Sequence, residues 1–152
     1  MPKILRALSL VGTMLAFAAS SLPQAPVPQV NLIHVEIDGL RNDKGQVLCA
    51  LFSSAGGFPK DRAQAIAHAS SEISHGHAIC DFSGIASGIY AISVFHDENS
   101  NGKLDTNFMG IPREGVGASN GARGHLGPPK FDAAAFHSSG GWVDLKVTIN
   151  YL

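Results

Sequence analysis

Residues 88–105 read GIYAISVFHDENSNGKLD, a strand-like run that leads directly into a polar turn. In an extended chain, one face of residues 88–96 carries side chains such as Tyr90 and Ile92, and the other face is also mostly apolar. This segment is the most strand-like piece of the chain. The turn that follows it has the form D-x-N-x-N-G-x-x-D, so we expect a fold built from strands that end in turns of this kind.

Four other segments show the alternation, or the continuous apolar run, that is typical of strands. They are residues 30–38, 46–52, 76–82 and 142–151. A short helix is expected over residues 60–69 (KDRAQAIAHA), where alanine favours it, and a helical turn at residues 131–136. Short strands without a long helix predict an all-β fold: an antiparallel, Ig-like β-sandwich with one long ordered loop region and little helix. A small barrel is the alternative.

The N-terminus has the form of a secretory signal peptide at residues 1–20. Lys3 and Arg6 give it a positive start, and the apolar run that follows is shorter than the roughly 20 residues that a membrane-spanning helix needs. Residues 21–29 form a proline-rich tether, and residues 30–152 are expected to form a single β-sandwich domain. The chain is therefore predicted to be periplasmic or secreted, with no membrane span in the mature chain. An uncleaved anchor is the alternative.

Charge and cysteine content agree with export. The predicted leader removes two of the eleven basic residues and no acidic one, which leaves nine against twelve and a formal net charge of −3. No basic cluster suits nucleic acid. Cys49 and Cys80 are the only cysteines, and each lies in a predicted strand. In an oxidising compartment we expect them to form a disulfide, with two buried free thiols as the alternative.

The turn after residue 96 has the ligand spacing of a calcium loop. Oxygen-bearing side chains recur on every second residue, and a glycine at the sixth position permits a sharp turn. By comparison with an EF-hand, the expected ligands are Asp97, Asn99, Asn101, the backbone carbonyl of Lys103, and Asp105. The twelfth position is Phe108 instead of a bidentate glutamate. The expected affinity for Ca²⁺ is therefore weak, about 10⁻⁴ to 10⁻³ M in dissociation constant.

The same residues also suit a turn that holds no ion. Asn and Asp side chains accept hydrogen bonds from nearby backbone groups, and Asn101 followed by Gly102 is typical of the positive backbone angles of a hairpin. A bound Ca²⁺ and a tight turn are equally favoured interpretations. Calcium is the one cofactor that the sequence suggests.

Histidine offers a competing site. His75 and His77 would lie on one strand face, and His96 ends a strand that could lie near them. Together with Asp97 they could hold zinc or copper, as in a metal-dependent hydrolase. Exposed histidines at a sheet edge are the favoured interpretation, because the spacing fixes no third ligand.

A long loop rich in glycine and proline follows the turn. Loops of this length inside a compact domain usually have a function or are held by specific contacts. This loop contains Arg113, Glu114, Asn120 and Arg123. The two arginines could clamp a carboxylate or a phosphate, but pairing with Glu114 or with loop carbonyls is the favoured interpretation.

Two stretches resemble known families. Residues 84–102, GIASGIYAISVFHDENSNG, are similar to the strand and turn of transthyretin-like and carboxypeptidase-regulatory-like β-sandwich modules. Residues 96–136 resemble the signature of a domain-of-unknown-function family of small exported bacterial proteins, with HDENxNGKLDTN, GIPxEG and GPPxF. At Val116 and Ala118 the sequence departs from the aromatic pair that is usual there. The resemblance implies an exported β-sandwich without established catalytic activity.

The expected function is non-enzymatic. The chain has neither a G-x-S-x-G elbow nor an H-E-x-x-H helix, and a disulfide explains its cysteines better than a nucleophile does. We therefore expect a monomeric exported module that binds Ca²⁺ weakly, or that presents its loops to an unknown protein or small ligand in the cell envelope. The metal-dependent hydrolase described above is the alternative.

Overall fold

The computed structural model describes residues 31–152, so the predicted signal peptide and proline-rich tether lie outside the described residues. Within residues 31–152 the chain is mainly strand with little helix, which confirms the all-β class. Its strands are β1 (Leu32–Asp38), β2 (Gln46–Phe52), β3 (Ala67–Ser71), β4 (Ala78–Ser83), β5 (Gly88–Asp97), β6 (Val116–Ala118), β7 (Phe136–Ser138) and β8 (Trp142–Thr148). Its helical elements are η1 (Arg62–Gln64), η2 (Ser119–Gly121) and α1 (Phe131–Ala134).

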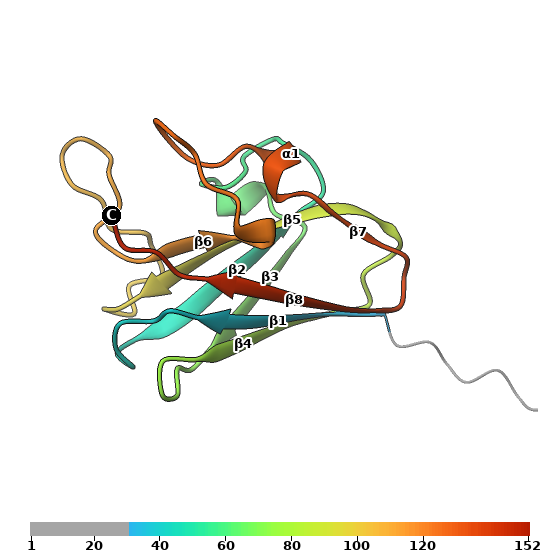
Figure 1. Ribbon diagram of the computed structural model, residues 1–152, viewed down its shortest axis with the longest axis horizontal. Coiled ribbons are helices and arrows are strands. Elements are labelled where there is room, and N and C mark those ends of the chain that lie inside the picture. Colours follow the sequence, from blue (N-terminus) through green and yellow to red (C-terminus); the bar gives the residue numbers. More distant parts are fainter. Residues whose placement is uncertain (1–30) are drawn as a thin grey trace, which may run out of the picture.

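The strands form two sheets (Figure 1). One sheet has the order β4-β1-β8, and the other has the order β3-β2-β5-β6, with β7 paired to the start of β5. Within the described residues the strand pairs are antiparallel except β1 and β8, which run parallel with Leu32 opposite Trp142. The structure therefore differs from a purely antiparallel sandwich at this one pair. Alternation along a strand sets which face is buried, but not which strand lies alongside or in which direction.

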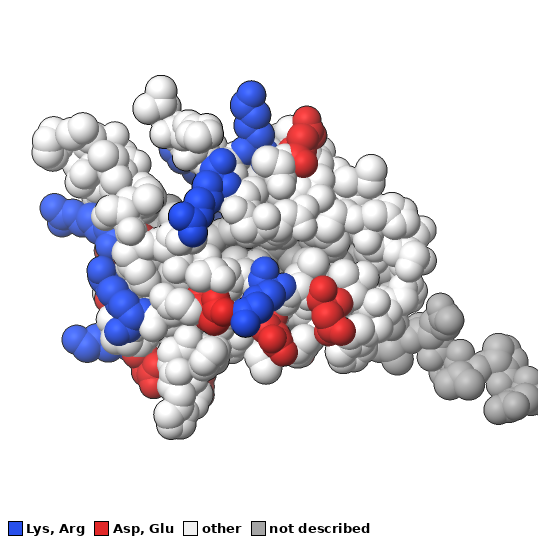
Figure 2. Space-filling view, in the orientation of Figure 1, with Lys and Arg blue, Asp and Glu red and all other residues white. Residues whose placement is uncertain are grey.

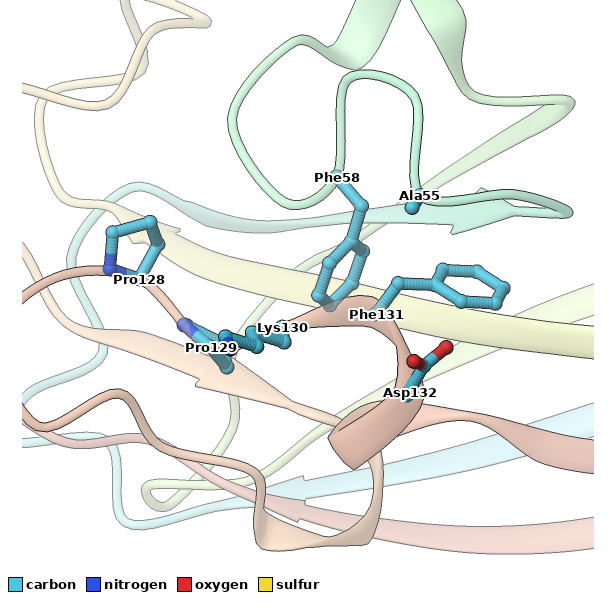
Figure 3. A pocket seen from close by; sticks show the side chains of 7 residues that line it. All are labelled: Ala55, Phe58, Pro128, Pro129, Lys130, Phe131 and Asp132. Atoms are coloured by element: carbon cyan, nitrogen blue, oxygen red, sulfur yellow. The ribbon is translucent and has the colours of Figure 1, made fainter.

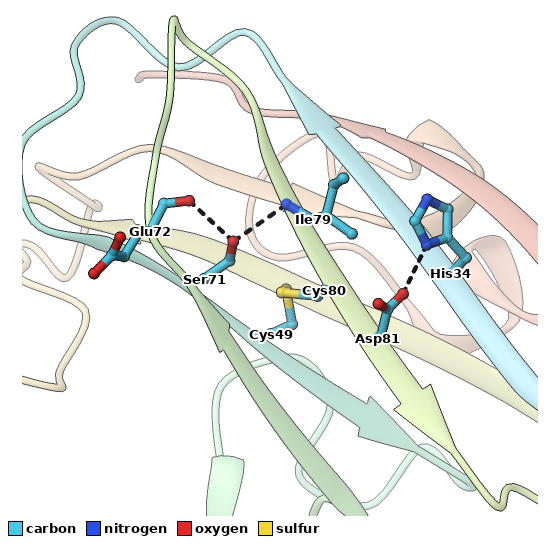
Figure 4. Close-up of a disulfide and its surroundings, with 7 residues drawn as sticks. All are labelled: His34, Cys49, Ser71, Glu72, Ile79, Cys80 and Asp81. Atoms are coloured by element: carbon cyan, nitrogen blue, oxygen red, sulfur yellow. Dashed lines mark hydrogen bonds and ion pairs between the residues drawn. A yellow bond between two sulfur atoms is a disulfide. The ribbon is translucent and has the colours of Figure 1, made fainter.

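The two sheets bury one shared hydrophobic core. Its strand residues come from the inward face of both sheets: Ile33, Val35, Ile37, Ala78, Cys80, Phe82 and Val147 from the first, and Val47, Cys49, Leu51, Tyr90, Ile92 and Val94 from the second. A disulfide joins Cys49 of β2 to Cys80 of β4 and so links the two sheets (Figure 4). The predicted pairing of the two cysteines is confirmed.

The helix predicted over residues 60–69 is wrong. The structure has a single 3-10 turn at Arg62–Gln64, capped by Asp61 Oδ1, which accepts the N–H of Ala63 at 3.1 Å. Strand β3 then begins at Ala67 and pairs with β2. A segment this short gains little from alanine propensity, and pairing with a buried strand outweighs it. None of the helices in the described part of the chain is long and apolar enough to cross a membrane.

A second, smaller cluster covers the outer face of β5. Ala91, Ala118 and Ala134 are buried there, and Phe58 and Phe131 pack against them. The rings of Phe58 and Phe131 meet edge to face with their centroids 5.8 Å apart (Figure 3). The helical turn predicted at residues 131–136 is present as α1 and is held by this cluster.

Candidate functional site

Strand β5 ends at Asp97, whose side chain is fully buried. Its carboxylate accepts the N–H of Asn101 at Oδ1 (3.0 Å) and the N–H of Gly102 at Oδ2 (2.9 Å). Gln46 Nε2, at the start of β2, also donates to Oδ2, at 3.0 Å. Asp97 thus folds the following turn back onto the end of β5 and ties it to the neighbouring strand.

Asn99, Asn101 and Asp105 lie together inside the turn. Asn99 Oδ1 accepts the N–H of Asn101 at 3.1 Å, and Asn101 Oδ1 accepts the N–H of Lys103 at 2.8 Å, so each amide makes a side-chain turn of its own. The Nδ2 groups of Asn99 and Asn101 donate to the two oxygens of Asp105, at 2.7 and 3.1 Å. The structure therefore brings these three predicted side chains together and joins them by hydrogen bonds.

The turn is tight because two of its residues have positive φ. They are Ser100, at 57°, and Gly102, at 74°. The expectation of positive angles at Asn101 and Gly102 is thus correct for Gly102 only, and the other positive angle of the turn is at Ser100. Gly45 lies against the base of the turn, where a Cβ atom would be 1.9 Å from the carbonyl oxygen of Asp97.

Glu114 closes the turn from outside, a role that the sequence did not suggest. Its side chain is buried, and Oε1 accepts the N–H of Glu98 at 2.9 Å while Oε2 accepts the N–H of Asp105 at 3.0 Å. One carboxylate therefore holds the first and last parts of the turn at a fixed distance. The expected pairing of Glu114 with an arginine is replaced by these backbone bonds, and Arg123 donates instead to Asn150 Oδ1.

The other polar residues of the long loop have structural contacts. Arg113 donates its backbone N–H to the carbonyl oxygen of Asp105 at 2.9 Å, and its side chain is exposed. Asn120 has a φ of 57°, and its Nδ2 donates to the carbonyl oxygen of Ala135 at 2.6 Å. With Arg123 bonded to Asn150, the structure shows no common partner for the two arginines within residues 31–152.

A buried polar chain links β5 to the turn between β1 and β2. His96 Nε2 faces the carbonyl oxygen of Lys44 at 2.7 Å, and His96 Nδ1 faces Tyr151 Oη at 2.7 Å. Because a carbonyl only accepts, Nε2 carries the proton and Nδ1 accepts from the tyrosine hydroxyl. Tyr151 Oη accepts the N–H of Arg41 at 3.1 Å. Burial raises the pKa of Tyr151, and this hydrogen bond offsets part of the effect.

Glu98 extends this chain into the turn. It pairs with the guanidinium of Arg41 and accepts a hydrogen bond from Asn42 Nδ2 at 3.1 Å. The same guanidinium lies over the ring of Tyr151, with 4.4 Å between its central carbon and the ring centroid. Burial alone would raise the pKa of the Glu98 carboxyl, but the hydrogen bonds from Asn42 and Arg41 and the charge of Arg41 outweigh it, and the pKa is lowered.

The predicted histidine site is not assembled in the described part of the chain. His75 has a φ of 52°, and its Nδ1 lies 2.9 Å from Ser74 Oγ, while the backbone of His77 pairs with Ser74. Both ring nitrogens of His96 already have partners. Among residues 31–152, no three or more His, Cys, Asp and Glu side chains gather in a group that could hold a metal ion.

Comparison with known proteins identifies a family but no activity. The model of a family described as "Uncharacterized protein conserved in bacteria (DUF2141)" matches residues 35–146. The matched range begins in β1 and ends in β8, so it includes the turn, Glu114 and both cysteines. No curated protein and no solved structure matches the chain.

Proposed function

The chain belongs to the DUF2141 family of uncharacterized bacterial proteins, and we propose that it is an exported, non-enzymatic β protein that binds Ca²⁺ weakly in the turn of residues 97–105. We further propose that this turn orders the long loop after it, which then meets a partner in the cell envelope. The disulfide between Cys49 and Cys80 supports export, because disulfides persist in oxidising compartments.

The observation that carries the calcium proposal is a set of carboxylates without basic partners. Asp97 and Glu114 are buried, and Asp105 lies between them along the chain. The ion pairs among the described residues involve other acids: His34 with Asp81, Arg41 with Glu98, and Lys146 with Asp38. Buried charge is costly without compensation, and here only backbone and amide N–H groups supply it. A hard cation would supply the missing positive charge.

The turn offers the oxygens that Ca²⁺ prefers. The Oδ1 atoms of Asn99 and Asn101 each accept one N–H and keep a second lone pair. Asp105 would exchange its two amide donors for the cation, and Lys103 would add its carbonyl oxygen. Only the carboxylates of Asp97 and Asp105 would contribute charge within the turn, and no bidentate glutamate closes it. These features support a dissociation constant of about 10⁻⁴ to 10⁻³ M.

Titration calorimetry of metal-stripped protein with CaCl₂ tests the proposal. We expect a dissociation constant in the millimolar range or just below it. A tenfold excess of calcium over that constant should stabilise the fold by about 1.4 kcal/mol and raise the melting temperature. Asp105→Asn should abolish the heat without unfolding the protein, whereas Asp132→Asn, an exposed control on α1, should not. Absence of heat and of a melting shift in millimolar calcium would leave the turn as a purely structural device.

Two further measurements address the remaining parts of the proposal. A parallel titration with zinc tests the histidine alternative, which requires tight zinc binding that His75→Ala removes. Intact mass with and without reductant, on protein recovered from the producing bacterium, tests export. We expect the oxidised mass with one bond between Cys49 and Cys80, and two free thiols would contradict export.

A further inference from the structure

The loop between the 97–105 turn and β6 ends in an apolar tip. Phe108 is 98% exposed and Met109 is 66% exposed. The tip is ordered, because Asn107 Oδ1 accepts the N–H groups of Met109 and Ile111 at 2.9 and 3.0 Å, and Thr106 pairs with Pro112 at the base of the loop. These bonds fix the backbone of the tip on which the exposed ring of Phe108 stands.

A second loop, between η2 and α1, has the same character. Leu126 at its tip is fully exposed, at 104% of its reference area. Leu126 also borders a hollow of about 500 Å³, together with Arg123, His125 and Lys130. The two loops leave opposite ends of β6, which has three residues and spans roughly 10 Å. Figure 1 shows both loops, in orange tones, extending beyond the sheets on the same side of the molecule.

Basic side chains accompany these tips although the chain as a whole is acidic. Residues 103–130 contain Lys103, Arg113, Arg123 and Lys130, all exposed. Their acidic residues are Asp105 and Glu114, whose carboxylates are engaged in hydrogen bonds within the turn. Figure 2 shows blue side chains near the bases of the protruding white loops. Apolar tips with positive charge at their bases match the depth profile of an anionic lipid surface.

We propose that the loops of residues 106–112 and 122–130 dock the protein on the surface of a bilayer that contains anionic phospholipid, with Phe108, Met109 and Leu126 among the acyl chains and the basic side chains at the phosphates. The tips protrude as separate bulges (Figure 2), whereas a stable protein partner needs a continuous face of about 800 Å². A bilayer accommodates such tips because its interior is fluid and apolar. The inference names the envelope partner of the proposed function but does not depend on calcium.

Co-sedimentation with extruded vesicles tests this docking. The purified chain is incubated in EDTA with vesicles of phosphatidylethanolamine and phosphatidylglycerol, and with vesicles of phosphatidylcholine alone. We expect binding to the anionic vesicles that weakens as salt shortens the Debye length. Phe108→Ser combined with Met109→Ser should lower the partition coefficient at least about tenfold. The matched control, Ile66→Ser combined with Ile79→Ser, removes two half-exposed apolar side chains elsewhere and should leave binding unchanged.

A tryptophan reporter locates the contact. In a Trp142→Phe background, Phe108→Trp should shift its emission to the blue on addition of anionic vesicles, whereas Ile79→Trp should not. Binding that the loop variants retain, or that the control variants lose equally, would overturn the proposal. So would no binding to either vesicle, in which case a protein partner takes its place. Because all arms contain EDTA, a failure here leaves the calcium titration standing, and a failure of that titration leaves this result standing.

Discussion

The carboxylate of Glu114 accepts the backbone N–H of Asp105 at 3.0 Å with one oxygen, while its other oxygen holds the start of the same turn. The two ends of the turn are therefore fixed by a residue that follows them in the chain. A side chain that binds two backbone donors across a loop reduces the freedom of every residue between them. This contact makes the turn of residues 97–105 a preformed unit instead of a flexible connection.

Replacing Glu114 should destabilise the protein more than replacing an exposed acidic residue does. Glu114→Ala leaves the N–H groups of Glu98 and Asp105 without their acceptor, so we expect a loss of about 2–3 kcal/mol in the free energy of unfolding by urea. Glu114→Gln keeps one acceptor oxygen and should recover part of the loss. Glu72→Ala, at an exposed acid, should change stability by less than about 0.5 kcal/mol. Equal losses for Glu114→Ala and Glu72→Ala would contradict the role of Glu114 as a clamp.

Tyr151→Phe tests how much the hydroxyl that contacts His96 Nδ1 contributes to stability. The variant removes the donor to His96 Nδ1 and the acceptor of the Arg41 N–H, and we expect a loss of about 1–3 kcal/mol. Tyr90→Phe removes one bond, to the carbonyl of Ala86, and should cost about 1 kcal/mol or less. Nitrogen NMR shifts of the wild-type protein should show His96 protonated at Nε2. Protonation at Nδ1 in the neutral ring would refute the assignment.

The ion pair between Asp38 and Lys146 should make stability depend on pH at the acidic end. A hydrogen bond from Thr148 and the ammonium of Lys146 lower the pKa of Asp38. A carboxyl whose folded-state pKa is depressed adds stability above its unfolded value of about 3.9, and this is lost as pH falls through the folded value. Lys146 Nζ lies 3.0 Å from Asp38 Oδ2 but is largely exposed, so screening by solvent keeps the effect small.

Asp38→Asn tests this dependence directly. The variant should be less stable than the wild type in urea at pH 7, and the difference should shrink as pH falls through the lowered pKa of Asp38, because the wild-type carboxyl then becomes protonated. Asp144→Asn, at an exposed acid on the same strand pair, should show no such convergence. A difference between wild type and Asp38→Asn that stays constant from pH 7 to pH 2 would assign the loss to packing instead of charge.

Sequence patterns predict those features of this fold that depend on local alternation. The buried positions of residues 142–151 follow from the period of two. The pairing of Cys49 with Cys80 follows instead from the even number of cysteines and the predicted oxidising compartment. The parallel pairing of β1 with β8 does not follow from the alternation, because alternation does not determine which strands lie side by side. Residues 60–69 mislead because alanine suits both a helix and a small inward position on an edge strand. Here, pairing with β2 decides.

The residue types of the turn were predictable from the sequence, but the role of Glu114 in holding the turn was not. The spacing of Asp97, Asn99, Asn101 and Asp105 marks a turn, and those side chains do meet. Glu114 could not be found in the same way. Its partners are backbone N–H groups nine and sixteen residues away, and backbone donors leave no mark in a sequence. Its neighbour Arg113 suggested an ion pair instead, which shows how a local charge pattern can hide a longer contact.

Gly45→Ala should lower the free energy of unfolding more than Gly84→Ala does, although the two glycines have similar positive φ angles. Gly45 has a φ of 69°, and Gly84 has a φ of 72°. The Cβ of an alanine at Gly84 would meet nothing within 4 Å, so the left-handed conformation alone should lower stability, by about 1–2 kcal/mol. An alanine at Gly45 would place its Cβ 1.9 Å from the carbonyl oxygen of Asp97, and the backbone must move to relieve it. We expect a further loss of about 1–3 kcal/mol, as for overpacking in a core.

Because the displaced atom belongs to the first residue of the turn, the affinity for Ca²⁺ should also fall in Gly45→Ala and stay unchanged in Gly84→Ala. Urea denaturation and calcium calorimetry of the two variants measure both effects. Equal stability losses would show that only the backbone angle matters at Gly45. An unchanged calcium affinity in a destabilised Gly45→Ala protein would show that the geometry of the turn does not depend on the packing beneath it.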